Sequence, residues 1–182
     1  CGAEKDEGIR PKMSQRLLDR MPKVLPGGKF ISAAISCLIN DGAAFVVLCS
    51  EKYLKQHQVQ AAAKVIGSAA CGGDPLVSPK TAVLALQKLL AKHGMSEKNI
   101  DGFELNEAFA VIDVMFARAF PQSIEKYNVF GGALAYGHPY GASGAIILLH
   151  LIKSLQQSDG KFGCCSVAAA GGIGTSLLVE RV

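Results

Sequence analysis

The sequence predicts an α/β domain in which helices pack in layers on a mixed β-sheet. From about residue 61 onward, short apolar runs rich in β-branched side chains alternate with longer segments whose apolar residues recur every three or four positions. This pattern is typical of buried strands that alternate with amphipathic helices. The last two apolar runs are joined through AGGIG, a glycine turn that indicates an antiparallel hairpin.

The N-terminal third is expected to be rich in loops. Residues 13–21 have weak helical spacing, which Pro22 and Pro26 end. The run AAFVVLC at 43–49 predicts a strand buried on both faces, and Ser50 is placed to cap a helix after it. A single strand of this kind needs a sheet, so we expect its partners in polypeptide outside this chain.

The remaining elements follow in alternating order. A strand is expected at 64–70, and Ser78 as N-cap with Pro79 at the first helical position predicts a helix that runs to His93 and ends at Gly94. Its apolar stripe faces the sheet and consists of Ala82, Val83, Leu86, Leu89 and Leu90. The later elements are a strand at 103–105, helices at 107–120 and 142–156, and strands at 162–168 and 175–180.

Composition limits the possible classes of function. The chain has 182 residues, 49% of them hydrophobic, and its 19 basic and 15 acidic residues are mixed, so a nucleic-acid partner has little support. The apolar stretch at 145–155 is shorter than the ~20 residues of a membrane span. The six cysteines lack metal-ligand spacing and are interpreted as reduced thiols of an intracellular protein. The start, CGAEKDEG, is interpreted as a cut and not a natural beginning.

Three segments combine glycine with polar groups where strands end or helices begin: LNEAFA at 105–110, YGHPYGASG at 136–144 and SVAAAGGIG at 166–174. We expect them at a common rim, where helix N-termini offer N–H donors to developing negative charge. Among the four histidines, His138 between Gly137 and Pro139 is the candidate general acid or base. The residues around His138 are by themselves equally consistent with a structural histidine.

These segments also carry a family resemblance. LNEAFA, GGALAYGHPYGASG and GGIGTSLLVERV, with DEGIRP and INDGAAFVVL before them, resemble the C-terminal portion of thiolases, the acyltransferases that make or cleave 3-ketoacyl-CoA. The resemblance implies a thiolase-like layered fold of two βαβαβαββ halves with an inserted loop domain. Residues 1–38 would be the tail of the loop domain, 39–60 the last strand and helix of the N-terminal half, and 61–182 the C-terminal half.

The resemblance assigns roles to individual residues. The family's nucleophilic cysteine lies in the N-terminal half, so it would be absent from this chain. His138 would activate that cysteine and help to hold the thioester oxygen, and Asn106 would position a water in the same oxyanion site. Glu107 would either anchor this site or interact with free N–H groups at the start of its own helix.

The family's second cysteine, which moves the proton at carbon 2, matches Ala168, and alanine cannot move a proton. The chain is then a natural variant, or the cysteine was replaced, or Cys165 substitutes for it. Strand alternation directs Cys165 to the opposite face from Ala168, and Cys164, on the same face, is roughly 13 Å away. Both cysteines are better explained as small packed residues.

The segment ISAAISCLINDG resembles the family's stretch along the pantetheine arm of coenzyme A. Cys37 stands where serine is usual and Leu38 where glycine is common, so the normal pantetheine hydrogen bond is in question; Phe130 also replaces a frequent asparagine. Phe109 matches an aromatic residue that lines the family's pocket, but a position in the core is an equal alternative. The residues expected to line the substrate site are Ala33, Cys37, Leu38, Phe109 and Ala170.

Three functions follow from this resemblance. The first is the C-terminal portion of a thiolase-family acyltransferase, which would be inactive as this chain alone. Such an enzyme takes coenzyme A thioesters as substrates and needs no metal or other cofactor. It would work together with its N-terminal half, in a homo-oligomer. The second is a non-catalytic acyl-CoA-binding or assembly subunit, which Ala168 favours while NEAF and GHP favour the enzyme. A decarboxylating condensing enzyme ranks last, because AAAGGIG lacks the second histidine or asparagine. Acyl-chain preference, reaction direction and compartment, whether cytoplasmic or mitochondrial, stay open.

Overall fold

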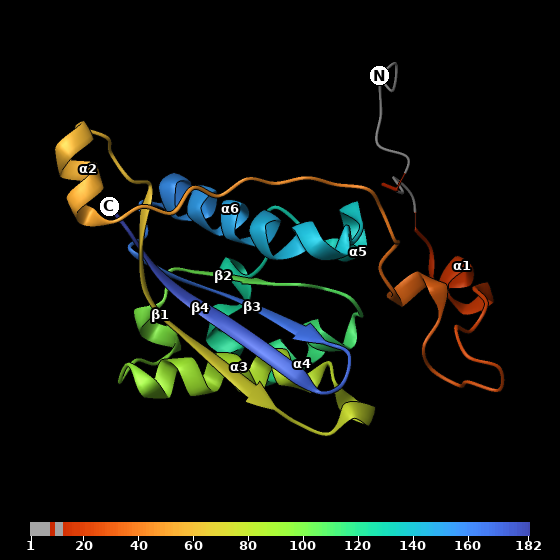
Figure 1. Ribbon diagram of the computed structural model, residues 1–182. Coiled ribbons are helices and arrows are strands. Elements are labelled where there is room, and N and C mark those ends of the chain that lie inside the picture. Colours follow the sequence, from red (N-terminus) through yellow and green to blue (C-terminus); the bar gives the residue numbers. More distant parts are fainter. Residues whose placement is uncertain (1–7, 10–12) are drawn as a thin grey trace, which may run out of the picture.

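The computed structural model describes residues 8–9 and 13–182, and its centre is a four-stranded sheet (Figure 1). The strands are β1 (Ala63–Gly72), β2 (Gly102–Leu105), β3 (Phe162–Ala169) and β4 (Ile173–Arg181), in the order β1-β4-β3-β2. β4 pairs antiparallel with both β1 and β3, and β3 pairs parallel with β2. The predicted mixed sheet and its terminal hairpin are thereby confirmed.

Helices cover both faces of the sheet, as Figure 1 shows. Helices α3 (Lys80–Lys92) and α4 (Val111–Ala119) pack on one face, and α6 (Tyr140–Ser158) packs on the other. Three shorter helices are α1 (Gln15–Arg20), α2 (Glu51–His57) and α5 (Ala133–Tyr136). Short 3₁₀ turns occur at Ala33–Ile35, Pro75–Val77, Glu97–Asn99 and Pro121–Lys126. The third strand expected in a βαβαβαββ unit would lie near Tyr127, between α4 and α6. It does not form a full strand, and a single parallel bridge between Phe103 and Tyr127 stands in its place.

Each face of the sheet has its own apolar core. The α3–α4 face contains the predicted stripe of α3 together with Phe103, Leu105 and Phe116, and the α6 face contains Ile147, Leu151 and Leu155. Alternation along β3 directs successive side chains to the two cores. Cys164 belongs to the first core with Ala168, and Cys165 belongs to the second, as the sequence predicts.

Two predicted helix starts are wrong. Ser78 does not cap α3: its hydroxyl donates to the carbonyl of Pro75 and accepts from the N–H of Gly172, so it ties two loops together and the helix starts at Lys80. The helix expected from residue 107 starts at Val111. Residues before it bond to a distant segment, because Ala110 N–H donates to the carbonyl of Ile35. These long-range bonds override the local signals.

The strand predicted at 43–49 does not form within this chain. The side chains of Phe45 and Val47 are 88% and 89% exposed, and no strand of the described residues lies beside them to pair with their backbone. The helix after it forms as expected, since the Ser50 hydroxyl accepts from the N–H of Tyr53 at 3.2 Å. In Figure 1 the segment between the Ala33–Ile35 turn and α2 runs along α6.

Candidate active site

Asn106 and His138 meet at the end of the sheet where β2 stops. Asn106 follows β2 directly and is 2% exposed, and its N–H donates to the carbonyl of Ser166, which extends the pairing with β3. His138 lies between α5 and α6, 32 residues further along the chain. Asn106 Nδ2 is 3.3 Å from His138 Nε2. Two residues assigned to one site by resemblance are thus in hydrogen-bonding contact.

The backbone around His138 is held in an unusual conformation. Gly137 has φ of +96°, which side chains rarely permit, and a Cβ there would lie 1.9 Å from Asn40 Oδ1. The N–H of His138 donates to the carbonyl of Leu38 at 2.8 Å. Glycine at 137 is therefore needed both for the turn and for the approach of the 38–40 segment.

The same segment also reaches the NEAF loop. Cys37 N–H donates to the carbonyl of Ala108 at 3.1 Å, and Ser36 forms an antiparallel bridge with Phe109. Residues 35–40 therefore run between the loop that carries Asn106 and the loop that carries His138. The burial of Cys37 raises the pKa of its thiol, partly offset by a backbone hydrogen bond.

Glu107 links the loop that carries Asn106 to Asn128 and to α5. Its carboxylate accepts from Asn128 Nδ2 at 2.7 Å and from the N–H of Leu134, in α5, at 3.3 Å. Gly132 makes room for it, since a Cβ there would lie 2.2 Å from the carboxylate. Because α4 begins only at Val111, Glu107 does not sit at the start of its own helix. It is an anchor between loops.

Two other carboxyl groups, the buried Glu104 and the half-buried Asp113, interact electrostatically with Glu107. Burial raises the pKa of Glu104 to about 8, with Glu107 adding to the rise. Burial likewise raises the pKa of Asp113 to about 6, although Asp113 accepts a hydrogen bond from the hydroxyl of Tyr127 at 2.5 Å, which acts in the opposite direction. The pKa of His138 is lowered by burial, so its neutral form, which can accept a proton, is favoured.

His138 has one further partner that the sequence analysis missed. Its Nδ1 lies 2.6 Å from the hydroxyl of Ser143, a residue of the first turn of α6 that is 4% exposed. The ring of Tyr140 lies 4.6 Å away, centroid to centroid. The only signal in the sequence was the position of Ser143 inside the GASG motif, five residues after His138.

Ala168 lies at the carboxyl end of β3 and pairs with Gly174 of β4. Its side chain packs against the core on the α3–α4 face. The glycine turn that follows is clamped by a distant loop, since Gly73 N–H donates to the carbonyl of Gly172 at 2.7 Å. Ala170 is exposed in this turn.

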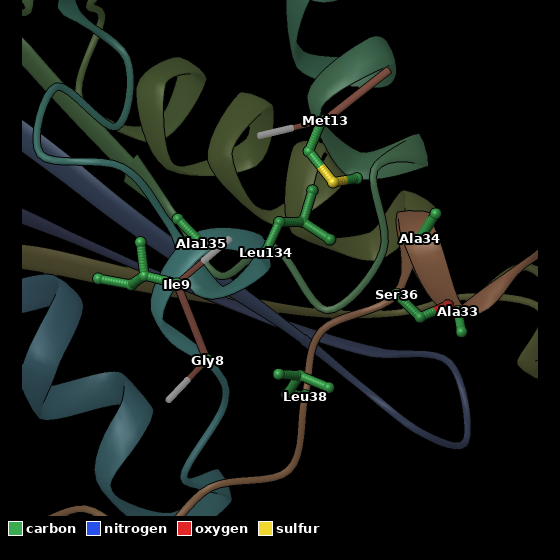
Figure 2. A pocket seen from close by; sticks show the side chains of 9 residues that line it. All are labelled: Gly8, Ile9, Met13, Ala33, Ala34, Ser36, Leu38, Leu134 and Ala135. Atoms are coloured by element: carbon green, nitrogen blue, oxygen red, sulfur yellow. The ribbon is translucent and has the colours of Figure 1, made fainter. Parts of the chain in front are cut away.

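A cavity of about 270 Å³ adjoins the His138 loop (Figure 2). Ala33 and Leu38, two of the expected substrate-site residues, line it, together with Leu134 and Ala135 of α5 on the opposite side. Leu38 connects the cavity to the site, because its carbonyl accepts from His138. The other expected residues do not line the cavity: Cys37 and Phe109 lie in the bridged segments, and Ala170 lies in the β3–β4 turn.

The described residues contain no cluster of three side chains suited to a metal ion. No helix among them is both long and apolar enough to cross a membrane. The cysteines that the structure describes are all free thiols: Cys37, Cys49, Cys71, Cys164 and Cys165.

Known proteins share this architecture. Residues 59–181 match the family model described as the thiolase C-terminal domain. An acetyl-CoA acetyltransferase of Synechocystis is 37% identical over 97% of this chain and 45% of its own length, and the mitochondrial 3-ketoacyl-CoA thiolase of mouse is 34% identical over 97% and 44%.

Solved structures agree. The acetyl-CoA acetyltransferase of Bacillus anthracis superposes with a TM-score of 0.91 at 31% identity, covering 98% of this chain and 45% of that one. Human mitochondrial 3-ketoacyl-CoA thiolase in complex with CoA superposes with a TM-score of 0.86 at 32% identity, covering 97% and 45%. The chain thus spans about 45% of the length of these relatives. It belongs to the thiolase family and corresponds to its C-terminal portion.

Proposed function

We propose that this chain is the C-terminal portion of a thiolase-type acyltransferase that cleaves or forms 3-ketoacyl-CoA when joined to an N-terminal half. The observation that carries the proposal is the contact between Asn106 and His138, 3.3 Å apart at the end of the sheet. In this proposal His138 takes the proton of a cysteine thiol carried by the N-terminal half. Asn106 then positions a water in the oxyanion site that holds the thioester oxygen, where each well-aimed donor lowers the barrier by roughly 3 kcal/mol.

The cavity beside His138 supports a coenzyme A thioester as the substrate. Its walls are mainly apolar and include Ala33, Leu38 and Leu134 (Figure 2). A thioester whose arm lay along this cavity would have its carbonyl near His138, because Leu38 both lines the cavity and accepts a hydrogen bond from the N–H of His138. The proposal assigns Cys37, Phe109 and Ala170 to the periphery of the same site, and it requires no metal or other cofactor.

An N-terminal half is supported by two unpartnered apolar surfaces. Phe45, Val47 and Leu48 are exposed in the segment that the sequence predicts as a strand. A second surface is a mostly apolar groove of about 250 Å³ on the α6 side of the sheet, lined in part by Leu148 and Val167. We propose that both surfaces contact the N-terminal half of the fold, which the relatives carry in addition to the part matched here. We also propose that residues 1–38, 39–60 and 61–182 are the three structural units of this chain. A homo-oligomer is also expected.

Ala168 favours the competing function, a non-catalytic acyl-CoA-binding or assembly subunit. An alanine at the position of the proton-moving cysteine leaves carbon 2 of the substrate without an acid or base. The fold, the cavity and His138 would persist in such a protein. The two functions differ in whether a thiol at this position restores turnover.

The deciding experiment is thiolysis of acetoacetyl-CoA by the full-length protein that carries this chain, with and without Ala168→Cys. Turnover by the Ala168→Cys protein that disappears when His138→Ala is added supports the enzyme. Binding of acyl-CoA without turnover in the Ala168→Cys protein supports the non-catalytic subunit. The 182-residue chain alone should show no turnover, because it would lack the nucleophile, and robust activity from it would contradict the proposal.

A further inference from the structure

We propose that Ser143 is a positioning residue that keeps the proton of neutral His138 on Nδ1, so that Nε2 keeps a lone pair, which accepts from Asn106 in this structure and can take the proton of a thiol that displaces that hydrogen bond. This inference rests on the proposed function, because it assigns a role within the same site. It starts from the two contacts of the imidazole ring. Asn106 Nδ2 lies 3.3 Å from Nε2, and Ser143 Oγ lies 2.6 Å from Nδ1.

These two contacts are compatible with a single neutral tautomer. With its NH₂ group turned toward Nε2, as in this structure, the Asn106 amide can only donate, so in this orientation Nε2 of His138 accepts and carries no proton. A neutral imidazole has one proton, which must then be on Nδ1, and Ser143 Oγ accepts it. Free histidine in water prefers the other tautomer, with the proton on Nε2, so the protein must hold the ring in the less common state.

The position of Ser143 suits this role. It lies in the first turn of α6 and is 4% exposed, and α6 is fixed on the sheet by the buried side chains of Ile147 and Leu151. Asn106 follows β2 directly. The ring of His138 is therefore held between a group fixed to the sheet and a group fixed to the helix that covers it.

The arrangement has a chemical consequence. When a thiol displaces the Asn106 amide from Nε2 and transfers its proton there, the S–H bond breaks, an N–H bond forms, and the products are a thiolate and an imidazolium. Ser143 continues to accept from Nδ1–H, and this bond strengthens once the donor carries charge.

The test is nitrogen-15 NMR of the histidine rings in the full-length protein, at a pH where His138 is neutral. In the unmodified protein, we expect His138 to have its proton on Nδ1. In Ser143→Ala, we expect Nε2–H to become the predominant form, because the acceptor is lost and the amide of Asn106 can rotate to accept. His150, also on α6, serves as an internal reference.

Two variants control for structural damage. Ser154→Ala removes a hydroxyl from the same helix at a site that is 7% exposed, and it should leave the His138 tautomer unchanged. Ser143→Thr keeps the hydroxyl and should keep the proton on Nδ1. The proposal is wrong if unmodified His138 carries its proton on Nε2, or if Ser143→Ala folds and leaves the tautomer as it was. Should Ser143→Ala not fold, the spectra of the unmodified and Ser143→Thr proteins decide.

Activity separates this inference from the proposed function. In the Ala168→Cys background, Ser143→Ala should lower kcat by on the order of 10²-fold, the usual contribution of a correctly protonated base. If kcat is unchanged while the tautomer shifts, the positioning role is refuted and the acyltransferase stands. If the tautomer behaves as expected but Ala168→Cys restores no turnover, the proposed function fails and the tautomer assignment stands.

Discussion

Glu104 makes the stability of this protein depend on pH in a way that one substitution should remove. The side chain is 1% exposed, and neither carboxylate oxygen has a hydrogen-bond partner in the described part of the chain. Burial, with a smaller contribution from Glu107, raises its pKa from 4.5 to about 8. At neutral pH the folded protein therefore keeps this carboxyl protonated, whereas the unfolded chain ionises it.

The sign of the effect follows from proton binding. Between pH 4.5 and about 8 the folded state binds one proton more than the unfolded state, so the free energy of unfolding falls as the pH rises and levels off above the folded pKa. Each tenfold difference in proton affinity is worth about 1.4 kcal/mol. The whole rise therefore corresponds to about 5 kcal/mol as an upper limit, because a structure that relaxes or admits water recovers part of it.

Glu104→Gln keeps the size of the side chain and removes its ionisation. We expect the variant to match the unmodified protein near pH 4.5 and to be more stable by several kcal/mol, up to about 5, at pH 9. Urea unfolding at a series of pH values measures this difference. Glu125→Gln, at an exposed position, is the control and should change the free energy of unfolding by less than about 0.5 kcal/mol. Parallel pH profiles for Glu104→Gln and the unmodified protein would refute the reasoning.

Two other predictions test the contacts of the site. Asn106→Asp replaces a donor to Nε2 by a carboxylate, so the pKa of His138 should rise by about one pH unit or more in an NMR titration, and an unchanged value would contradict the contact. Gly132→Ala should displace the Glu107 carboxylate and cost about 1–3 kcal/mol in thermal unfolding. Gly141→Ala in α6, with open space around the new methyl group, should instead be neutral or stabilising by up to about 1 kcal/mol.

Local patterns were sufficient for much of the fold. The apolar stripe of α3, the β3–β4 hairpin and the opposite faces of Cys164 and Cys165 all follow from periodicity, which depends only on the backbone geometry of each element. The cap at Ser50 is equally local, since it joins residues three positions apart. These features need no contact between residues that are distant in the sequence.

Signals failed where a distant segment offered a better partner. Ser78 is of a residue type that favours N-caps, but its hydroxyl accepts a hydrogen bond from the N–H of Gly172, far along the chain. The 43–49 segment has the composition of a strand, yet a strand needs a neighbour that the described residues do not provide. In both cases the outcome depends on a partner outside the window that a sequence pattern covers.

By itself, the sequence determined the class of the fold, its family resemblance and the candidacy of Asn106 and His138. Only the tertiary structure decided that these two side chains touch, that Glu107 binds α5 and not its own helix, and that Ser143 contacts the ring of His138. The physical reason is that periodicity fixes which way a side chain points within one element. Hydrogen bonds of about 3 Å between separate elements depend on how those elements pack, and packing is a property of the whole chain.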